Sequence, residues 1–392
     1  MKIAVIGVGT AGITSLCHSL RYLSNENDTV TSIHDPDVKI LAIGESMDPG
    51  FPTTLFEGTN FTLLDDAERL DATLKLGVQW KNWRNKEFTS YMHPPYYAMH
   101  FNNGKLKEFC FERFATIWGN KFQVIKGSVT SLTSTFHNAS VTVDNIEHEF
   151  DFVIDCRGTP KDFTDYNVID DPVNHCLVNV INEPGEWKTT IHQAHANGWM
   201  FGIPLTSRQG WGYLYNDNIT PREDAVKDIE KIFNTTELNL REFKFSSYYA
   251  KTFFNGRIIK NGNAALFFEP MEALSGYFYT GVMQHLTDYI RGECSVDDVN
   301  NKLSIIAQDM ENFINFAYHG GANFDSEFWT TTVKKTSNKL DNDPRWQSTV
   351  QEIRSCLNNG KIVQEKSIAQ WYIRHWLNWD KHLEYNLFAD WT

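Results

Sequence analysis

The chain has 392 residues, of which 41% are hydrophobic and 22% are charged, and its formal net charge is −13. This composition indicates a globular protein, and the negative charge without a basic tract argues against nucleic acid as a partner. The sequence contains no run of 18 apolar residues that could span a membrane, and because a strand is predicted to begin at Lys2 we expect no signal peptide.

The six cysteines are scattered along the chain. They form no CxxC pair, and no histidine cluster stands at metal-ligand spacing. The sequence therefore argues against a structural zinc ion or a disulfide framework, and we expect a reduced, cytoplasmic protein without a metal.

The first elements in chain order predict a βαβ unit with a glycine-rich turn. The turn reads Gly7-Val8-Gly9-Thr10-Ala11-Gly12 and lies within a predicted strand, helix and strand at residues 2–6, 10–23 and 30–33. Gly7 permits the tight turn, Gly9 lets the backbone approach a pyrophosphate, and Gly12 lets the helix pack on the strand. The turn predicts a dinucleotide site, and a glycine turn without a ligand is the alternative.

Acidic residues that follow two strands are candidates for further nucleotide contacts. The second strand usually ends in an acid that accepts a hydrogen bond from the ribose, but here it ends in Ile33-His34-Asp35. His34 stands at the expected position, so Asp35, one residue later, is the candidate. Asp155-Cys156-Arg157-Gly158 follows an apolar strand and looks like the second nucleotide-facing strand of FAD-linked oxygenases.

The rest of the chain predicts a mixed fold of the α/β class. Helices are predicted at residues 57–70, 101–116 and 277–291, and strands at 74–80, 122–143 (a pair), 150–154, 178–181, 198–203 and 212–215. We expect a Rossmann-like dinucleotide-binding core with an inserted, mixed substrate-side sheet at residues 1–298, followed by a helical C-terminal layer at residues 299–392.

Three further motifs carry a family resemblance. They are Thr73-Leu74-Lys75-Leu76-Gly77-Val78-Gln79-Trp80, Gly198-Trp199-Met200-Phe201-Gly202-Ile203-Pro204 and Glu269-Pro270-Met271-Glu272. With the glycine turn, they make residues 1–329 similar to the flavin-dependent halogenases of the tryptophan halogenase family. The chain resembles a short variant of this family, and the phage-encoded type is the candidate for that variant. These enzymes attach a halogen to electron-rich aromatic rings.

The resemblance implies FAD as the cofactor, used in its reduced form. The segment Gly262-Asn263-Ala264-Ala265-Leu266-Phe267 looks like the flavin-ring segment of the halogenases, and it lacks the Gly-Asp dipeptide of related hydroxylases. No second GxGxxG is present for NAD(P)H, so we expect a separate flavin reductase to supply FADH2. The implied FAD contacts are Gly7, Gly9, Thr10, Ala11, Gly12, Asp35, Gly44, Glu45, Ser46, Asp155, Gly158, Asn263, Ala264, Pro270 and Tyr277.

The resemblance also implies two catalytic residues, Lys75 and Glu272. In an alternating strand Leu74, Leu76, Val78 and Trp80 share one face, which places Lys75 on the other, where a lysine is ordinarily solvated. In the family this lysine instead directs hypohalous acid to one ring carbon, by hydrogen bonding or as a haloamine. Glu272, at a predicted helix start, would position the electrophile or take the ring proton; its alternative is a helix-terminal charge.

Further residues are implied for the halide, the tunnel and the substrate. Where the family has Ser-Thr-Gly, this chain has Ala273-Leu274-Ser275-Gly276, so the motif is either substituted or displaced by one residue. The halide contacts are assigned to Ser275 and Gly276, and the halide is chloride, bromide or iodide. Trp199, Phe201 and Pro204 would separate substrate from flavin, with an aromatic core strand as the alternative. His93 would line the substrate pocket, and the long lid of the tryptophan enzymes is missing after it.

The sequence therefore predicts a halogenase of a small electron-rich aromatic compound other than free tryptophan, with bromide or iodide favoured over chloride. The alternatives are an FAD-dependent aromatic hydroxylase and a flavin-binding protein without catalysis. Association into a homo-oligomer is left open by the sequence.

Overall fold

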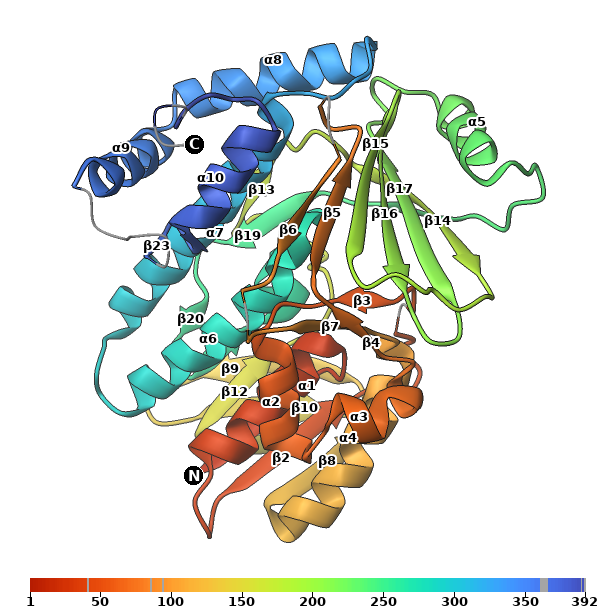
Figure 1. The fold of residues 1–392 in the computed structure, drawn as a ribbon. Helices are drawn as coiled ribbons and strands as arrows, with labels where there is room; N and C mark the ends of the chain where they lie inside the picture. The colour runs from red at the N-terminus through yellow and green to blue at the C-terminus, as the bar shows by residue number, and fades with distance from the viewer. Residues whose placement is uncertain (41, 85–86, 94, 360–365, 389, 391–392) are drawn as a thin grey trace.

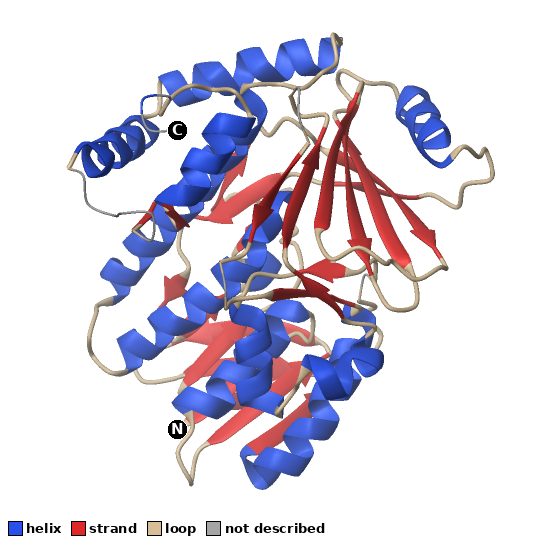
Figure 2. Ribbon diagram, in the orientation of Figure 1, coloured by secondary structure: helices blue, strands red, loops and turns tan. Residues whose placement is uncertain are grey.

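A computed structural model describes residues 1–40, 42–84, 87–93, 95–359, 366–388 and 390. It confirms the α/β class: a mostly parallel sheet lies at the bottom of Figure 1, a second large sheet at the upper right, and long helices at the upper left. Figure 2 shows a small sheet between the two large ones. Among the described residues, no helix is both long and apolar enough to cross a bilayer.

The sheet at the bottom of Figure 1 has six strands in the order β20-β21-β12-β1-β2-β8, and only β20 is antiparallel to its neighbour. Its strands are β1 (Lys2–Ile6), β2 (Thr29–His34), β8 (Phe122–Lys126), β12 (Phe152–Asp155), β20 (Phe254–Asn255) and β21 (Ile258–Lys260). In β1, Ile3 and Val5 belong to the main core and Ala4 and Ile6 to a second core on the other face. Because both faces are covered, β1 is a continuous apolar run.

Helices pack on one side of this sheet and a meander on the other. Helix α1 (Thr10–His18), which continues as a π-helical turn (Ser19–Leu23), contacts α2 (Gly50–Thr59), α4 (Asn103–Trp118) and α6 (Leu274–Ile290). The opposite side carries the antiparallel strands β9 (Val129–Ser134), β10 (Ala139–Val143) and β11 (Ile146–Phe150), whose apolar residues form the second core.

Two sequence predictions in this region are wrong in detail. Residues 57–70 are not one helix, because α2 ends at Asn60, which is left-handed (φ 54°), and α3 (Leu63–Asp66) and a 3-10 turn (Ala67–Leu70) follow. Residues 122–143 form three strands instead of a pair, because Gly127 (φ 155°) separates β8 from β9. A second 3-10 turn (Gly119–Lys121) joins α4 to β8.

The predicted single strand over residues 74–80 is also wrong, and this difference shapes the site. Strand β4 (Thr73–Lys75) pairs with β7 (Ala98–Phe101) in the small sheet β3-β7-β4, in which β3 is Glu45–Ser46. Strand β5 (Gly77–Lys81) belongs to the second large sheet. The chain crosses between the sheets at Leu76, whose N–H donates to Lys188 O at 2.8 Å, and at Gly77, where a β-carbon would lie only 2.3 Å from Ser90 O. The crossing breaks the alternation, so Lys75 does not face solvent.

The second large sheet has seven strands in the order β18-β14-β17-β16-β15-β5-β6. They are β5, β6 (Phe88–Tyr91), β14 (His175–Ile181), β15 (Thr190–His195), β16 (Gly198–Pro204), β17 (Gln209–Tyr215) and β18 (Arg241–Lys244). Helix α5 (Arg222–Phe233) packs on one face through Ala225 and Ile229. A further three-stranded sheet consists of β13 (Tyr166–Ile169), β19 (Ser247–Ala250) and β22 (Leu266–Phe267).

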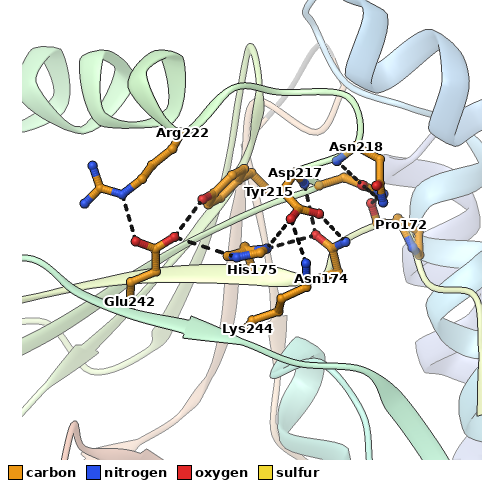
Figure 3. A network of polar contacts seen from close by, with 10 residues as sticks. Pro172, Asn174, His175, Tyr215, Asp217, Asn218, Arg222, Glu242 and Lys244 are labelled. Atoms are coloured by element: carbon orange, nitrogen blue, oxygen red, sulfur yellow. Dashed lines mark hydrogen bonds and ion pairs between the residues drawn. The ribbon is translucent and has the colours of Figure 1, made fainter.

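A polar network fixes the outer edge of the seven-stranded sheet, away from β5 (Figure 3). His175 of β14 lies 3.4 Å from Asp217 Oδ2 and 3.7 Å from Glu242 Oε1 of β18. Glu242 also accepts a hydrogen bond from Arg222 Nε at the start of α5, at 2.7 Å. The network joins β14, β18 and α5, and we assign it a structural role.

The C-terminal part is helical, as predicted, with one small hairpin. Its elements are α7 (Val296–His319), α8 (Glu327–Asp341), α9 (Pro344–Asn358), the strands β23 (Ser367–Ile368) and β24 (Trp371–Tyr372), and α10 (Ile373–His382). Phe313 of α7 packs against Trp371, Trp376 and Trp379, with ring centroids 4.5 to 6.0 Å apart. Helix α10 contacts β6, so this layer closes over the sheet edge that carries β5 and β6.

Candidate active site

The glycine turn after β1 has the geometry of a phosphate cradle. Gly7 is left-handed (φ 99°), and a β-carbon there would lie 2.6 Å from Cys156 O; a β-carbon at Gly12 would lie 2.1 Å from Gly7 O. A β-carbon at Gly9 would meet no atom within 4 Å, so the space in front of α1 is open. No side chain caps α1, and its first N–H groups can therefore bind an anion.

Three predicted cofactor contacts lie close to this turn. Thr10 Oγ1 donates a hydrogen bond to one carboxylate oxygen of Glu45, and Asn103 Nδ2 donates to the other at 2.7 Å. Burial raises the pKa of Glu45. Ser46 Oγ shares a hydrogen bond with Thr190 Oγ1 at 2.8 Å, and Gly44 is left-handed (φ 127°). Glu45 therefore links β3 to the start of α1, beside the open space at Gly9.

The two acids predicted for the nucleotide differ in their surroundings. Asp35 is half-buried beyond β2 and borders a surface hollow of about 300 Å³. His34, which stands where an acid was expected, is 4% exposed and packs edge-on against Phe111, so it belongs to the core. Asp155 lies at the end of β12 with both carboxylate oxygens 2.9 Å from Arg157. A β-carbon at Gly158 would meet no atom within 4 Å.

The predicted flavin-ring segment lies against the glycine turn. It forms a 3-10 turn (Gly262–Ala264), and a β-carbon at Gly262 would lie 2.6 Å from Cβ of Ala11. Two tyrosine hydroxyls fix the turn. Tyr248 donates a hydrogen bond to Asn263 O and Tyr166 donates one to Ala264 O, each at 2.8 Å. Two segments about 250 residues apart in sequence thus meet, and they fit a dinucleotide that runs from one to the other.

Lys75 is buried, with 1% of its side chain exposed. Its Nζ donates a hydrogen bond to Met47 O at 3.1 Å. Burial lowers the pKa of Lys75 to about 8, although Glu272 and Asp48 oppose the shift. Because a buried ammonium costs several kcal/mol and is rarely kept without a role, Lys75 is a strong candidate for function.

Glu272 lies in a strained turn, close enough to Lys75 for each charge to affect the pKa of the other. It belongs to a 3-10 turn (Met271–Ala273) before α6, and both Glu272 (φ 54°) and Ala273 (φ 56°) are left-handed. Such conformations cost about 1–3 kcal/mol each for residues other than glycine. Glu272 Oε1 accepts a hydrogen bond from Trp80 Nε1 at 3.0 Å. Burial raises the pKa of Glu272 to about 7, against the opposing effects of Lys75 and Trp80.

The predicted halide residues form the first turn of α6. Ala273 offers no side-chain acceptor at the helix start, so the N–H groups that follow it can bind an anion. A β-carbon at Gly276 would lie 2.8 Å from Asp48 Oδ2, so a larger residue there would require Asp48 or Met47 to shift. Pro270 precedes the strained turn, whereas Tyr277 is 43% exposed and its hydroxyl donates to Gln370 at 2.9 Å.

The predicted tunnel residues lie along β16, all of whose residues are buried. Trp199 Nε1 donates to the hydroxyl of Tyr318 at 2.6 Å, and that hydroxyl donates to Glu269 Oε1 at 2.7 Å. The Phe201 ring fills the space over Gly212. Pro204 O accepts a hydrogen bond from Thr73 Oγ1 at 2.7 Å, which ties the end of β16 to the strand of Lys75.

His93 lies in the connection between β6 and β7, near the surface. It is half-buried, with its ring centroid 6.5 Å from that of Tyr96. Exposed tyrosines flank it: Tyr91 is 66% exposed and Tyr96 59% exposed. Only residues 92–97 join the two strands, and the described residues of this connection form no long lid after His93.

Sequence reasoning missed several residues at this site. Trp80 stood in the Lys75 motif, and its indole donor could have suggested a carboxylate partner. Asp48, Tyr318 and the buried His192 gave no signal, because nothing in the sequence indicates which distant elements pack against Lys75 and Trp199.

Comparisons with known proteins show which family the chain matches. The family model for tryptophan halogenase matches residues 2–96 and 86–368. The chain is 21% identical to tryptophan 7-halogenase KtzQ of Kutzneria sp. (strain 744), over 84% of this chain and 78% of that one.

Solved structures share the fold. A tryptophan halogenase from Shewanella frigidimarina is 17% identical with a TM-score of 0.79, covering 99% of this chain and 89% of its own. A flavin-dependent halogenase from Xanthomonas campestris is 17% identical with a TM-score of 0.73, covering 87% and 83%.

Proposed function

We propose that this chain, which belongs to the tryptophan halogenase family, halogenates an electron-rich aromatic substrate with Lys75 and Glu272 as its catalytic residues. It is an FADH2-dependent oxidoreductase that depends on a separate flavin reductase. The observation that carries the proposal is the buried ammonium of Lys75 facing the half-buried carboxyl of Glu272, in an enzyme of this family.

The residues of the glycine turn and of the 262–264 turn would hold FAD. Bound reduced FAD, with dioxygen, supplies the oxidation of halide to hypohalous acid. The open space at Gly9 and Gly158 and the uncapped α1 support this placement. The first turn of α6, with Ser275 and Gly276, would bind the halide.

Lys75 and Glu272 would then carry out the aromatic substitution. The ammonium of Lys75 hydrogen-bonds the oxygen of hypohalous acid and gives it a proton as the oxygen–halogen bond breaks, so that water leaves while the carbon–halogen bond forms; the proton lost by Lys75 is balanced by the one that leaves the ring. Glu272 takes the ring proton. A pKa of about 7 for Glu272 and of about 8 for Lys75 gives both groups the required form near neutral pH.

Trp199 and Phe201 would separate the substrate from the flavin. The Trp199 ring is held by its bond to Tyr318 and by rings on two sides, with His192 at 4.9 Å and Trp83 at 6.0 Å. A fixed aromatic wall of this kind would keep a substrate ring away from the flavin.

Two alternatives remain in other functional classes. A hydroxylase would transfer oxygen directly to the substrate, and the buried Lys75 and the absent Gly-Asp dipeptide argue against it. A flavin-binding protein without catalysis is favoured only by the altered Ser-Thr-Gly motif.

Lys75→Ala should abolish halogenation and retain flavin binding. The assay combines the enzyme with reduced FAD, dioxygen, bromide and an activated phenol or indole, and product masses are counted. We expect halogenated product from the parent and less than about one hundredth of it from the variant, because the electrophile loses its guide. Lys81→Ala on β5 is the control and should stay active. Product within a few-fold of the parent in Lys75→Ala, or an oxygenated product from the parent, would contradict the proposal.

Glu272→Gln should reduce kcat by about 10²-fold or more and leave flavin affinity unchanged, since glutamine cannot take the ring proton yet still accepts from Trp80. In the parent, kcat/KM should fall below pH of about 7, where Glu272 is protonated, and above about 8, where Lys75 is neutral. In Glu272→Gln, the residual kcat/KM should no longer fall on the acidic side of the pH profile. Equal loss of flavin binding would mark Glu272 as structural.

Free L-tryptophan should be a poor substrate, although the Kutzneria relative is a tryptophan 7-halogenase. The connection at 92–97 offers no lid to clasp an ammonium and a carboxylate, and the tyrosines around it leave an open, aromatic rim. Larger or less polar aromatic compounds should therefore be turned over faster than tryptophan at equal concentration. A low-micromolar dissociation constant for tryptophan would overturn this expectation.

Bromide or iodide should be used in preference to chloride. The nest at Ser275 and Gly276 is shifted or substituted relative to the family motif, and Asp48 Oδ2 borders it. Chloride is the most costly of the three to dehydrate, so a looser nest penalises it most. Competition at equal halide concentrations measures the preference, and mainly chlorinated product would refute it.

A further inference from the structure

A carboxylate outside the predicted set, Asp48, lies against the first turn of α6, one residue after the carbonyl that Lys75 contacts. Asp48 follows β3, and its Oδ1 accepts a hydrogen bond from Gly50 N–H at 2.7 Å, an Asx turn that starts α2. Its other oxygen, Oδ2, is buried and has no hydrogen-bond partner among the described residues. A buried carboxylate oxygen without a partner is costly, and its retention calls for an electrostatic reason.

The second carboxylate oxygen of Asp48, Oδ2, lies next to the first turn of α6. A β-carbon at Gly276 would lie 2.8 Å from Oδ2, so this oxygen rests against α6. Lys75 Nζ donates to Met47 O, the carbonyl of the preceding residue, at 3.1 Å. The charge of Asp48 raises the pKa of Lys75 against the effect of burial, and Lys75 in turn opposes the raised pKa of Asp48.

The other titratable groups around Lys75 supply little negative charge apart from Glu272. His192 of β15 is buried, and burial and Lys75 lower its pKa to about 3. His100 of β7 is neutral for the same two reasons, with Lys188 as a further cation near it. The pKa of Tyr277 on α6 is raised by the partial burial of its side chain and by Asp48, so its phenol stays neutral.

We propose that Asp48 is the counter-charge of Lys75, which keeps the buried ammonium protonated and leaves Glu272 free to exchange a proton. One ammonium between two carboxyls requires only one of them ionised for neutrality. With Asp48 in that role, Glu272 can be neutral or charged near pH 7 without leaving Lys75 uncompensated. The proposal rests on the proposed function of Lys75 and Glu272, and it makes Asp48 a positioning residue that acts through Lys75.

The test measures the ionisation of Lys75 directly, in protein without added flavin. The enzyme is labelled with [6-¹³C]lysine, and the resonance of Lys75 is assigned from its absence in Lys75→Ala. Asp48→Asn keeps the oxygen that accepts from Gly50 and removes the charge, so the titration midpoint of Lys75 should fall by about one pH unit. Asp48→Ser, which also keeps an acceptor for Gly50, should lower the midpoint as well.

Asp71→Asn is the matched control. Asp71 is a buried carboxylate just before β4, but it pairs with Lys105 at 2.8 Å, so its loss should leave the midpoint of Lys75 in place. In turnover, Asp48→Asn should move the alkaline limb of kcat/KM to lower pH by the same amount as the midpoint.

A midpoint that stays at the parent value in Asp48→Asn and Asp48→Ser would overturn the proposal. So would an equal fall in Asp71→Asn. Failure of the proposed function is a different result: Lys75→Ala would keep its halogenated product, while the shift of the Lys75 midpoint by Asp48→Asn would be unaffected.

Discussion

The site depends on one buried ammonium. An isolated Lys75 side chain in the interior would lose its proton or move to solvent, because the free-energy cost of removing an unpaired charge from water exceeds the free energy gained by packing the side chain. Here Nζ has a carbonyl at 3.1 Å and two carboxyls that raise its pKa, and it still retains a pKa of only about 8. The balance between burial and carboxylates therefore places Lys75 within the range in which a proton can be gained or lost near neutral pH.

The crossing of the chain between two sheets creates that burial. Strand β4 ends at Lys75 in the small sheet, and β5 begins at Gly77 in the seven-stranded sheet. A continuous strand would have placed Lys75 on one face and Trp80 on the other. With the break, Lys75 is buried and Trp80, five residues later, donates to Glu272. A single short motif thus supplies both the ammonium and the group that holds the carboxyl opposite it.

The sequence predicted the fold class, the βαβ start and the helical C-terminal part, because glycine spacing and apolar periodicity are local signals that tertiary packing seldom overrides. It failed at residues 57–70 and 74–80, where left-handed Asn60 and a change of sheet interrupt a regular pattern. Lys75 and Glu272 could be singled out only from the family resemblance. Asp48 and Tyr318 could not, because their importance lies in contacts between elements far apart in the chain.

The segment from Glu269 to Gly276 joins the separate parts of the site mechanically. Glu269 is fixed by Tyr318, which also holds Trp199, and Glu272 is fixed by Trp80. Gly276 is pressed against Asp48 at the other end. The two left-handed residues between these anchors have a strained backbone that a flexible loop would relax. The contacts at the anchors must therefore hold the turn in this conformation. Because this short segment is held by Tyr318 at Glu269, by Trp80 at Glu272 and by Asp48 at Gly276, a shift of any one anchor would move the rest of the segment, including the predicted halide nest.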